Sequence, residues 1–201
     1  LQKQALQMEE EMVADWTLPN RGVFKGEALQ NFINQKVKNL PIQKMPKPLG
    51  VVATDLQSGE MMLFRSGNTG MAVRASSAVP GVFQPVEISG RDYVDGGLTS
   101  PVPAQVARTM GADFVIAVDI SNVSRRDKLT GTLDVLLQTF AIMGRSINQF
   151  ELKDADVVWR PQLNGVSSAD FTARKRAIDA GREAALAGLP ALRQRLAAMT
   201  H

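Results

Sequence analysis

Apolar residues recur three or four positions apart through much of the chain, and this spacing is typical of helices that bury one face. Helices are therefore predicted over residues 1–16, 26–39, 71–78, 104–110, 133–150 and 170–201. The opening helix rests on five apolar positions: Leu1, Ala5, Met8, Met12 and Trp16. Asn20 is predicted to end it. Pro190, close behind Gly188, is expected to divide the last segment into two helices.

Short apolar runs predict strands between these helices. Two pairs of runs are joined by short polar turns that contain glycine, which predicts two β-hairpins: residues 49–54 with 61–64, and 86–88 with 92–94. Residues 114–118 form a continuous apolar run, typical of a strand covered on both faces of a parallel sheet, and residues 155–159 predict another strand. This alternation predicts an α/β fold, a three-layer sandwich with a mostly parallel central sheet and hairpin additions.

Composition narrows the class of protein. With 201 residues, 44% of them hydrophobic, the chain has the makeup of a soluble globular domain. Its 23 basic and 20 acidic side chains nearly balance, which argues against a nucleic-acid partner. Without cysteine, and with one terminal histidine, only carboxylate ligation of a metal remains; because the acids lack metal-loop spacing, we expect neither metal nor cofactor. The lack of cysteine fits a reducing compartment, so a cytoplasmic or peripheral membrane location is favoured and the compartment stays open.

Five lysines gather between residues 25 and 47 against the single acid Glu27: Lys25, Lys36, Lys38, Lys44 and Lys47. Such a patch suits peripheral contact with an anionic membrane surface. The alternative, more frequent for such clusters, is a solvated rim that only aids solubility. No apolar run approaches the ~18 residues needed to cross a bilayer. The chain begins at Leu1 without methionine or a signal-peptide layout, so we expect that a preceding part is absent.

Three acids follow apolar strands and mark candidate site positions, because functional groups gather at the carboxyl ends of strands in open α/β sheets. They are Asp55, Asp95 and Asp119. The segment Asp95-Gly96-Gly97 stands out, since glycines allow unusual backbone angles and the close approach of a second group. A tight turn is the alternative explanation of this segment.

The only histidine is the last residue, His201, so acyl transfer here requires a carboxylate as the base for a serine. The chain has no Gly-x-Ser-x-Gly, the strained turn that exposes a nucleophilic serine. The nearest match, residues 144–148, lacks the last glycine and falls in a predicted helix. Ser76 and Ser77 are more plausible neighbours of a site, although tight helix packing also explains them. Residues 67–70 are glycine-rich but follow no apolar strand, so they are not expected to bind an oxyanion.

At these residues the chain resembles the bacterial patatin-like phospholipases, serine acyl hydrolases that use a Ser/Asp dyad. The matching motifs are residues 51–56 (VVATDL), 72–86 (AVRASSAVPGVFQPV), 94–98 (VDGGL), 101–103 (PVP), 110–113 (MGAD) and 117–119 (AVD). The likeness runs from about Trp16 to Leu189. It implies a patatin-like fold and makes Asp95 the catalytic acid. The family's oxyanion loop and nucleophile elbow lie N-terminal to everything matched, and no residue here inherits either role.

The resemblance implies that residues 1–201 are a single domain, the C-terminal part of a patatin-like domain whose N-terminal part is absent from this chain. The implied function is hydrolysis of lipid acyl esters by an upstream serine, with Asp95 as its base and lipid or acyl ester as substrate. This chain alone is then expected to be inactive. The alternative is a non-catalytic scaffold or interaction domain that kept the fold without the nucleophile. A Gly-x-Ser-x-Gly sequence upstream of Leu1 distinguishes the two hypotheses.

Overall fold

The computed structural model describes residues 2–6, 9, 15–17, 21–121, 131–166 and 171–199. Some positions used in the predictions lie outside them: Leu1, Met8, Met12, Asn20, residue 170 and His201. Of the predicted opening helix, α1 (Gln2–Leu6) is described. Trp16 instead pairs with Phe24 in an isolated antiparallel bridge, with ring centroids 4.5 Å apart. The opening helix therefore does not extend to Trp16.

The larger sheet has four strands in the order β2-β1-β4-β3, and every pairing in it is antiparallel. Its strands are β1 (Val51–Asp55), β2 (Met61–Phe64), β3 (Val86–Ile88) and β4 (Arg91–Asp95). Both predicted hairpins are confirmed, as β1–β2 and β3–β4. The predicted mostly parallel sheet is wrong for this part, because strands joined by tight turns return antiparallel and the two hairpins then join edge to edge through β1 and β4, again antiparallel.

A second sheet consists of β5 (Ile116–Val118) and β6 (Val157–Trp159), which pair in parallel. Alternation along β5 places Ala117 on a buried face, whereas Ile116 and Val118 are 41% and 49% exposed. The prediction that this strand is covered on both faces is therefore wrong within the described residues. Part of α5 (Thr132–Glu151) is open as well, since Phe150 is 68% exposed.

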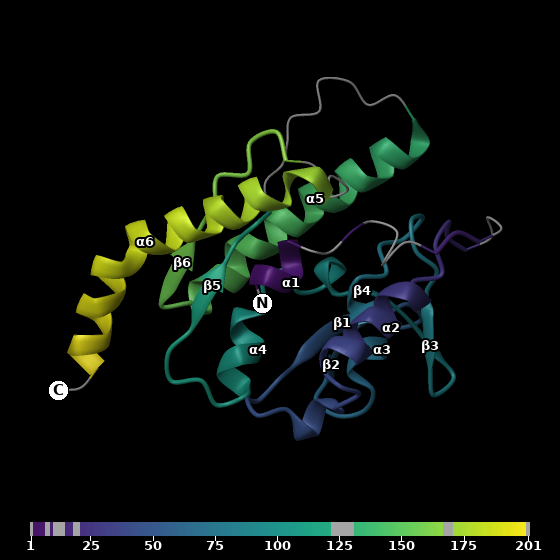
Figure 1. Cartoon of the computed structure of the whole chain (residues 1–201), viewed down its shortest axis with the longest axis horizontal. Helices are drawn as coiled ribbons and strands as arrows, with labels where there is room; N and C mark the ends of the chain where they lie inside the picture. Colours follow the sequence, from purple (N-terminus) through teal and green to yellow (C-terminus); the bar gives the residue numbers. More distant parts are fainter. Residues whose placement is uncertain are drawn as a thin grey trace.

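Helices lie around the two sheets in separate groups, as Figure 1 shows. The first group comprises α3 (Thr69–Ser76), which contacts β1 and β4, and α2 (Glu27–Lys36), which contacts α3. In the second group, α6 (Arg174–Met199) contacts β6, and α4 (Ala104–Thr109) contacts the short 3-10 turn η4 (Leu152–Asp154). The remaining 3-10 turns are η2 (Ile42–Lys44), η3 (Gly96–Leu98) and η5 (Phe171–Ala173). None of the helices in the described part of the chain is long and apolar enough to span a membrane.

The last helix, α6 (Arg174–Met199), continues through Pro190, so the predicted division into two helices is wrong. Proline removes one main-chain donor and distorts one turn, but the bonds on either side keep a long helix going. The ribbon changes direction in its yellow C-terminal part, which fits a kink rather than an end (Figure 1). Gly188 lies so close to the indole of Trp159 that a Cβ there has no room, so this glycine permits packing on β6.

The main buried cluster lies between α3 and the four-stranded sheet and consists of Ala53, Ala75, Ala78, Val86 and Tyr93. The alanines let α3 approach the sheet closely, so side chains of β1 and β4 pack directly on the helix. Because β4 ends at this core, the packing fixes the place of Asp95.

Candidate active site

Asp95 ends β4, opposite Ala53 of β1, and hydrogen bonds hold both of its main-chain polar groups. Its N–H donates to the carbonyl of Ala78, just after α3, at 3.0 Å. Its carbonyl accepts from Thr54 Oγ1 at 2.9 Å, and that hydroxyl is also 2.9 Å from Thr99 Oγ1. The backbone that carries this carboxylate is therefore fixed from β1, from α3 and from the loop that follows it.

Few groups stabilise the negative charge of the Asp95 carboxylate. Its Oδ1 accepts from Gly97 N–H at 2.6 Å, which caps η3. Within the described residues, Oδ2 has no hydrogen-bond partner and neither oxygen has a cationic one. Burial raises the pKa of Asp95, and the Gly97 hydrogen bond opposes this rise without cancelling it. Asp95 therefore caps a turn, as the alternative explanation predicted, and its carboxylate also has a raised pKa.

The two glycines after Asp95 lie close to other atoms, and Gly96 is required for space. Neither has a positive φ, so the expectation of unusual backbone angles is wrong here. A Cβ on Gly96 would overlap the main-chain carbonyl of Val52, whereas a Cβ on Gly97 would lie 2.9 Å from Asp95 Oδ1. The expected close approach is confirmed at Gly96, and the approaching group is β1.

Asp55 has a structural environment. Its Oδ1 accepts from the N–H groups of Gln57 and Ser58 at 2.9 and 3.0 Å, which closes the β1–β2 turn. Its Oδ2 accepts from Arg91 Nε on β4. The hydrogen bond from Arg91 lowers the pKa of Asp55 to about 2 against the effect of burial, and the two turn N–H groups add to this. Asp55 is a poor proton acceptor at neutral pH.

Asp119, after β5, is engaged in the same way. Its Oδ1 accepts from Ser121 N–H at 3.1 Å and from the Ser121 hydroxyl, and its Oδ2 accepts from Arg160 Nε at 3.2 Å. Burial raises the pKa of Asp119, but the hydrogen bonds from Ser121 and Arg160 outweigh it, so the net pKa is lowered. The three predicted acids therefore have separate hydrogen-bond partners, and the direction of its pKa shift sets Asp95 apart from the other two.

The serines considered in the sequence do not contact Asp95. Ser76 is the last residue of α3 and Ser77 is its C-cap, and neither hydroxyl bonds Asp95. Their neighbours Ala75 and Ala78 are fully buried, so tight packing of this segment is confirmed. Ser146 is exposed on α5, where its hydroxyl donates to the carbonyl of Ile142 at 3.3 Å.

The glycine-rich residues 67–70 form a helix cap. Asn68 Oδ1 accepts from Met71 N–H at 2.8 Å, and Gly70 N–H donates to Asn34 Oδ1 at 2.8 Å. The N–H groups of Gly67 and Gly70 therefore already have acceptors, whereas binding an oxyanion requires free donors; that the loop binds none stays a prediction.

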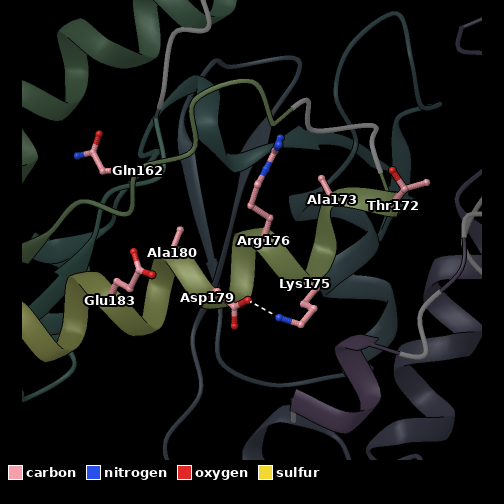
Figure 2. A pocket seen from close by; sticks show the side chains of 8 residues that line it. All are labelled: Gln162, Thr172, Ala173, Lys175, Arg176, Asp179, Ala180 and Glu183. Carbon is pink, nitrogen blue, oxygen red and sulfur yellow. Dashed lines mark hydrogen bonds and ion pairs between the residues drawn. The ribbon is translucent and has the colours of Figure 1, made fainter.

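A hollow on the surface follows the first half of α6 and includes none of the three acids. Figure 2 shows its lining side chains: Gln162, Thr172, Ala173, Lys175, Arg176, Asp179, Ala180 and Glu183. Lys175 Nζ and Asp179 Oδ2 pair there at 2.7 Å, one helical turn apart. Among the described residues no three His, Cys, Asp or Glu side chains gather as metal ligands do. That no cofactor is used stays a prediction.

Sequence analysis missed one contributor to this site. Thr54 is 4% exposed and holds the carbonyl of Asp95. A threonine inside the buried strand before Asp55 is the signal that points to it, because a buried hydroxyl needs a partner.

Comparison with known proteins adds independent information. Residues 10–108 match the family model for patatin-like phospholipases. An uncharacterized NTE family protein of Mycobacterium bovis is 35% identical over 107 residues, covering 53% of this chain and 30% of the relative. Another, of Mycobacterium tuberculosis, is 27% identical over 204 residues, covering 89% of this chain and 35% of the relative. Patatin-like phospholipase domain-containing protein 6 of Mus musculus is 32% identical over 122 residues, covering 60% of this chain and 9% of that protein.

The fold and the strand-end carboxylate define an α/β protein with an antiparallel sheet, a parallel pair and a candidate general base. Residues 10–108 belong to the patatin-like phospholipase family, as the motifs within them predicted. The matched region contains the four-stranded sheet and Asp95. The chain spans 30 to 35% of the length of the mycobacterial relatives.

Proposed function

We propose that this chain is part of a lipid acyl-ester hydrolase that uses a Ser/Asp dyad. Asp95 is the base, and the nucleophilic serine precedes Leu1. One observation carries the assignment of Asp95: of the three strand-end acids it alone has a raised pKa and no cationic partner among the described residues. A general base works best when its pKa is moved toward the pH at which it operates.

The proposed reaction has two steps. The serine oxygen attacks the acyl carbonyl carbon while Asp95 accepts the hydroxyl proton; the ester bond then breaks, and the alcohol of the lipid leaves with that proton. Asp95 next accepts a proton from water, whose oxygen attacks the acyl-serine. The fatty acid is released, and the proton returns to the serine oxygen. The fixed main chain of Asp95 supports this role, since proton transfer requires a base held within hydrogen-bond reach.

We also propose that residues 1–201 form the C-terminal part of one patatin-like domain. The open apolar face of β5, with Ile116 and Val118, supports this, because exposed apolar strands are normally covered. The share of the relatives' length that the chain covers is consistent with it.

Peripheral contact with an anionic membrane stays a prediction. All five lysines of the basic patch are exposed, and they lie just before α2, at its last residue and on the connector after it: Lys25, Lys36, Lys38, Lys44 and Lys47. Exposure suits a membrane surface and a solvated rim equally, so both interpretations remain open.

A non-catalytic scaffold is the second candidate function. The observation that favours it is the cap of η3, because Asp95 Oδ1 already has a structural hydrogen bond with Gly97 N–H. The two functions predict opposite results for the experiment that follows.

Asp95→Asn in the full-length protein is expected to lower hydrolysis of a short-chain activated ester by about 10² to 10⁴-fold. Asparagine is nearly isosteric and its carbonyl oxygen can still accept from Gly97 N–H, but it cannot take a proton. The rate of ester cleavage and labelling by a fluorophosphonate probe measure the effect. Asp113→Asn, at an exposed acid, is the matched control and should leave both unchanged.

Full activity of Asp95→Asn would remove Asp95 from the mechanism. Absence of activity and of labelling in the full-length wild-type protein would instead favour the scaffold. The isolated 201-residue chain is expected to show neither activity nor labelling; labelling of it would mean that a serine within the chain is the nucleophile.

A further inference from the structure

The C-terminal end of α5 carries a charge that does not suit a helix end. The last residue of the helix is Glu151, and its last turn has no basic residue. The carbonyl groups at a helix C-terminus make the local potential negative, so a carboxylate there is unfavourable unless another interaction compensates it. Glu151 is half-buried, which makes such an interaction more necessary.

The compensating interactions come from the segment that follows Asp95. Glu151 Oε1 accepts from the Ser100 hydroxyl, and its Oε2 accepts from Val102 N–H at 3.0 Å. Ser100 is only 4% exposed, so its hydroxyl bonds the carboxylate away from bulk water. One carboxylate thus holds a side chain and a main-chain group two residues apart in the same loop.

A second point of α5 touches the same loop. A Cβ on Gly144 would lie 3.6 Å from Pro101 Cγ and 3.8 Å from the carbonyl oxygen of Gly97. These are ordinary van der Waals distances, so the helix lies close to the loop at Gly144 and would have room for a methyl group there. Thr54 and Ala78 hold the backbone of Asp95 itself, whereas Glu151 holds the part of the loop beyond Gly97.

We propose that Glu151 is a positioning residue for the reaction: by holding Ser100 and Val102 it fixes the Asp95-Gly96-Gly97 turn. The connection runs through Gly96, whose carbonyl accepts from Ser100 N–H at 2.9 Å, to Gly97 N–H, which donates to Asp95 Oδ1. Glu151 acts through the loop and touches no reacting atom. This inference rests on the proposed function, because it takes Asp95 to be the base.

The test is a double-mutant cycle in the full-length protein with Glu151→Gln and Ser100→Ala. A glutamine at position 151 can still accept from Val102 N–H with its oxygen, but its NH₂ group can only donate to Ser100 Oγ, so the serine hydroxyl loses its acceptor and both bonds lose the carboxylate charge that strengthens them. We expect kcat to fall about 10 to 100-fold with KM nearly unchanged, because small displacements of a catalytic group have effects of this size. Ser100→Ala alone should lower kcat less.

The double variant should lose less activity than the two single losses combined. The hydrogen bond from the Ser100 hydroxyl to the Glu151 carboxylate is already lost in Glu151→Gln, so Ser100→Ala removes less in that background. This non-additivity is the sharpest expectation, since independent losses of stability would add instead. Fluorophosphonate titration counts the folded active sites, so that a loss of folded protein is not taken for a loss of kcat.

The pH dependence of kcat/KM gives a second readout. It distinguishes a loosened turn from the mere loss of a negative charge at position 151. If the turn loosens in Glu151→Gln, Asp95 loses the Gly97 hydrogen bond that lowers its pKa, and the acid limb of kcat/KM moves to higher pH. If removal of the negative charge at position 151 were the only effect, the limb would move to lower pH. Glu183→Gln, at an exposed glutamate on α6, is the matched control and should change neither rate nor profile.

The outcomes distinguish this inference from the function on which it rests. Loss of activity in Asp95→Asn together with normal kinetics in Glu151→Gln would overturn the positioning role and leave the dyad intact. Additive losses in the cycle, or a limb that moves to lower pH, would also overturn it. Retained activity in Asp95→Asn would mean that the proposed function itself has failed.

Discussion

At the scale of single residues, the three strand-end carboxylates differ in their partners. Arginine and turn N–H groups stabilise the negative charge of two of them, whereas the third has no cationic partner among the described residues. Asp55 and Asp119 each bond an arginine and turn donors, and the pKa of each is lowered. Asp95 is half-buried, its carboxylate accepts one hydrogen bond, from the Gly97 N–H group, and its pKa is raised. Its ionised form is therefore less favourable in the folded chain than in the unfolded chain, and this cost is what makes Asp95 a stronger base.

Asp95→Asn is expected to raise the melting temperature of the full-length protein at neutral pH. A carboxyl group with a raised folded-state pKa destabilises the fold as pH rises from its ordinary value of 3.8 toward the folded-state value, and the full cost persists above that. Below the ordinary value the group is protonated in both states and costs nothing. The increase in melting temperature should therefore be present at neutral pH and disappear at acid pH. Thermal melts of the variant and the wild type over a range of pH measure it.

A gain that does not depend on pH would contradict this explanation, since it would come from packing rather than from charge. Asp113→Asn is again the control, and it should leave the melting temperature unchanged at every pH.

At the scale of elements, three of them meet at the turn after β4. β1 approaches so closely that Gly96 has no room for a side chain, α3 supplies the Ala78 carbonyl, and α5 lies over the loop at Gly144. The two glycines of the turn serve different contacts: Gly96 faces main chain, and Gly97 faces only the carboxylate of Asp95 within 4 Å. Their substitution should therefore affect different properties.

Gly96→Ala is expected to destabilise the full-length protein by about 1 to 3 kcal/mol or more, because the added methyl group meets the rigid carbonyl of Val52. Gly97→Ala should change stability by less than about 1 kcal/mol, since Asp95 can rotate away and the loss of backbone freedom in the unfolded chain offsets the strain. It should nevertheless lower kcat, because that rotation moves the base. Thermal melts and ester cleavage measure the two effects.

Gly181→Ala in α6 is the control for these two variants. No atom lies within 4 Å of the added methyl group, so it should stabilise the protein by up to about 1 kcal/mol through helix propensity. If Gly97→Ala destabilised the fold as strongly as Gly96→Ala, the different roles assigned to the two glycines would be wrong.

Much of this arrangement follows from local sequence patterns. Both hairpins, five of the helices and the position of Asp95 at a strand end were predicted from spacing and turn residues alone. The partners that decide the chemistry were not, because Arg91 lies 36 residues from Asp55, and Arg160 lies 41 residues from Asp119. No periodicity within one segment encodes such contacts. Pro190 shows a different limit, because a local rule predicted an end where a long helix tolerates a kink.

At the scale of the whole molecule, apolar surface lies open along β5 and α5. Ile116 and Val118 point away from the buried side of β5, and Met143 and Phe150 on α5 are 52% and 68% exposed. Large contiguous apolar surfaces on soluble proteins usually mark contact with something else. The proposed N-terminal part of the domain is the partner that accounts for an uncovered strand, because a strand that is apolar on both faces fits the inside of a sheet covered on two sides.

The substitution Val118→Thr tests whether the missing part covers β5, because it should benefit the isolated chain and harm the full-length protein. Threonine keeps the β-branched shape that suits a strand but adds a hydroxyl group. In the isolated 201-residue chain, Val118 is 49% exposed, so the change should reduce aggregation, as light scattering measures. In the full-length protein the same position is expected to be buried, so an unpartnered hydroxyl should cost about 1 to 3 kcal/mol in thermal melts. Val115→Thr, at a residue 5% exposed on the other face, should destabilise both proteins. If Val118→Thr left the full-length protein as stable as the wild type, this face of β5 would be open there too, and the proposal that the missing part covers it would fail.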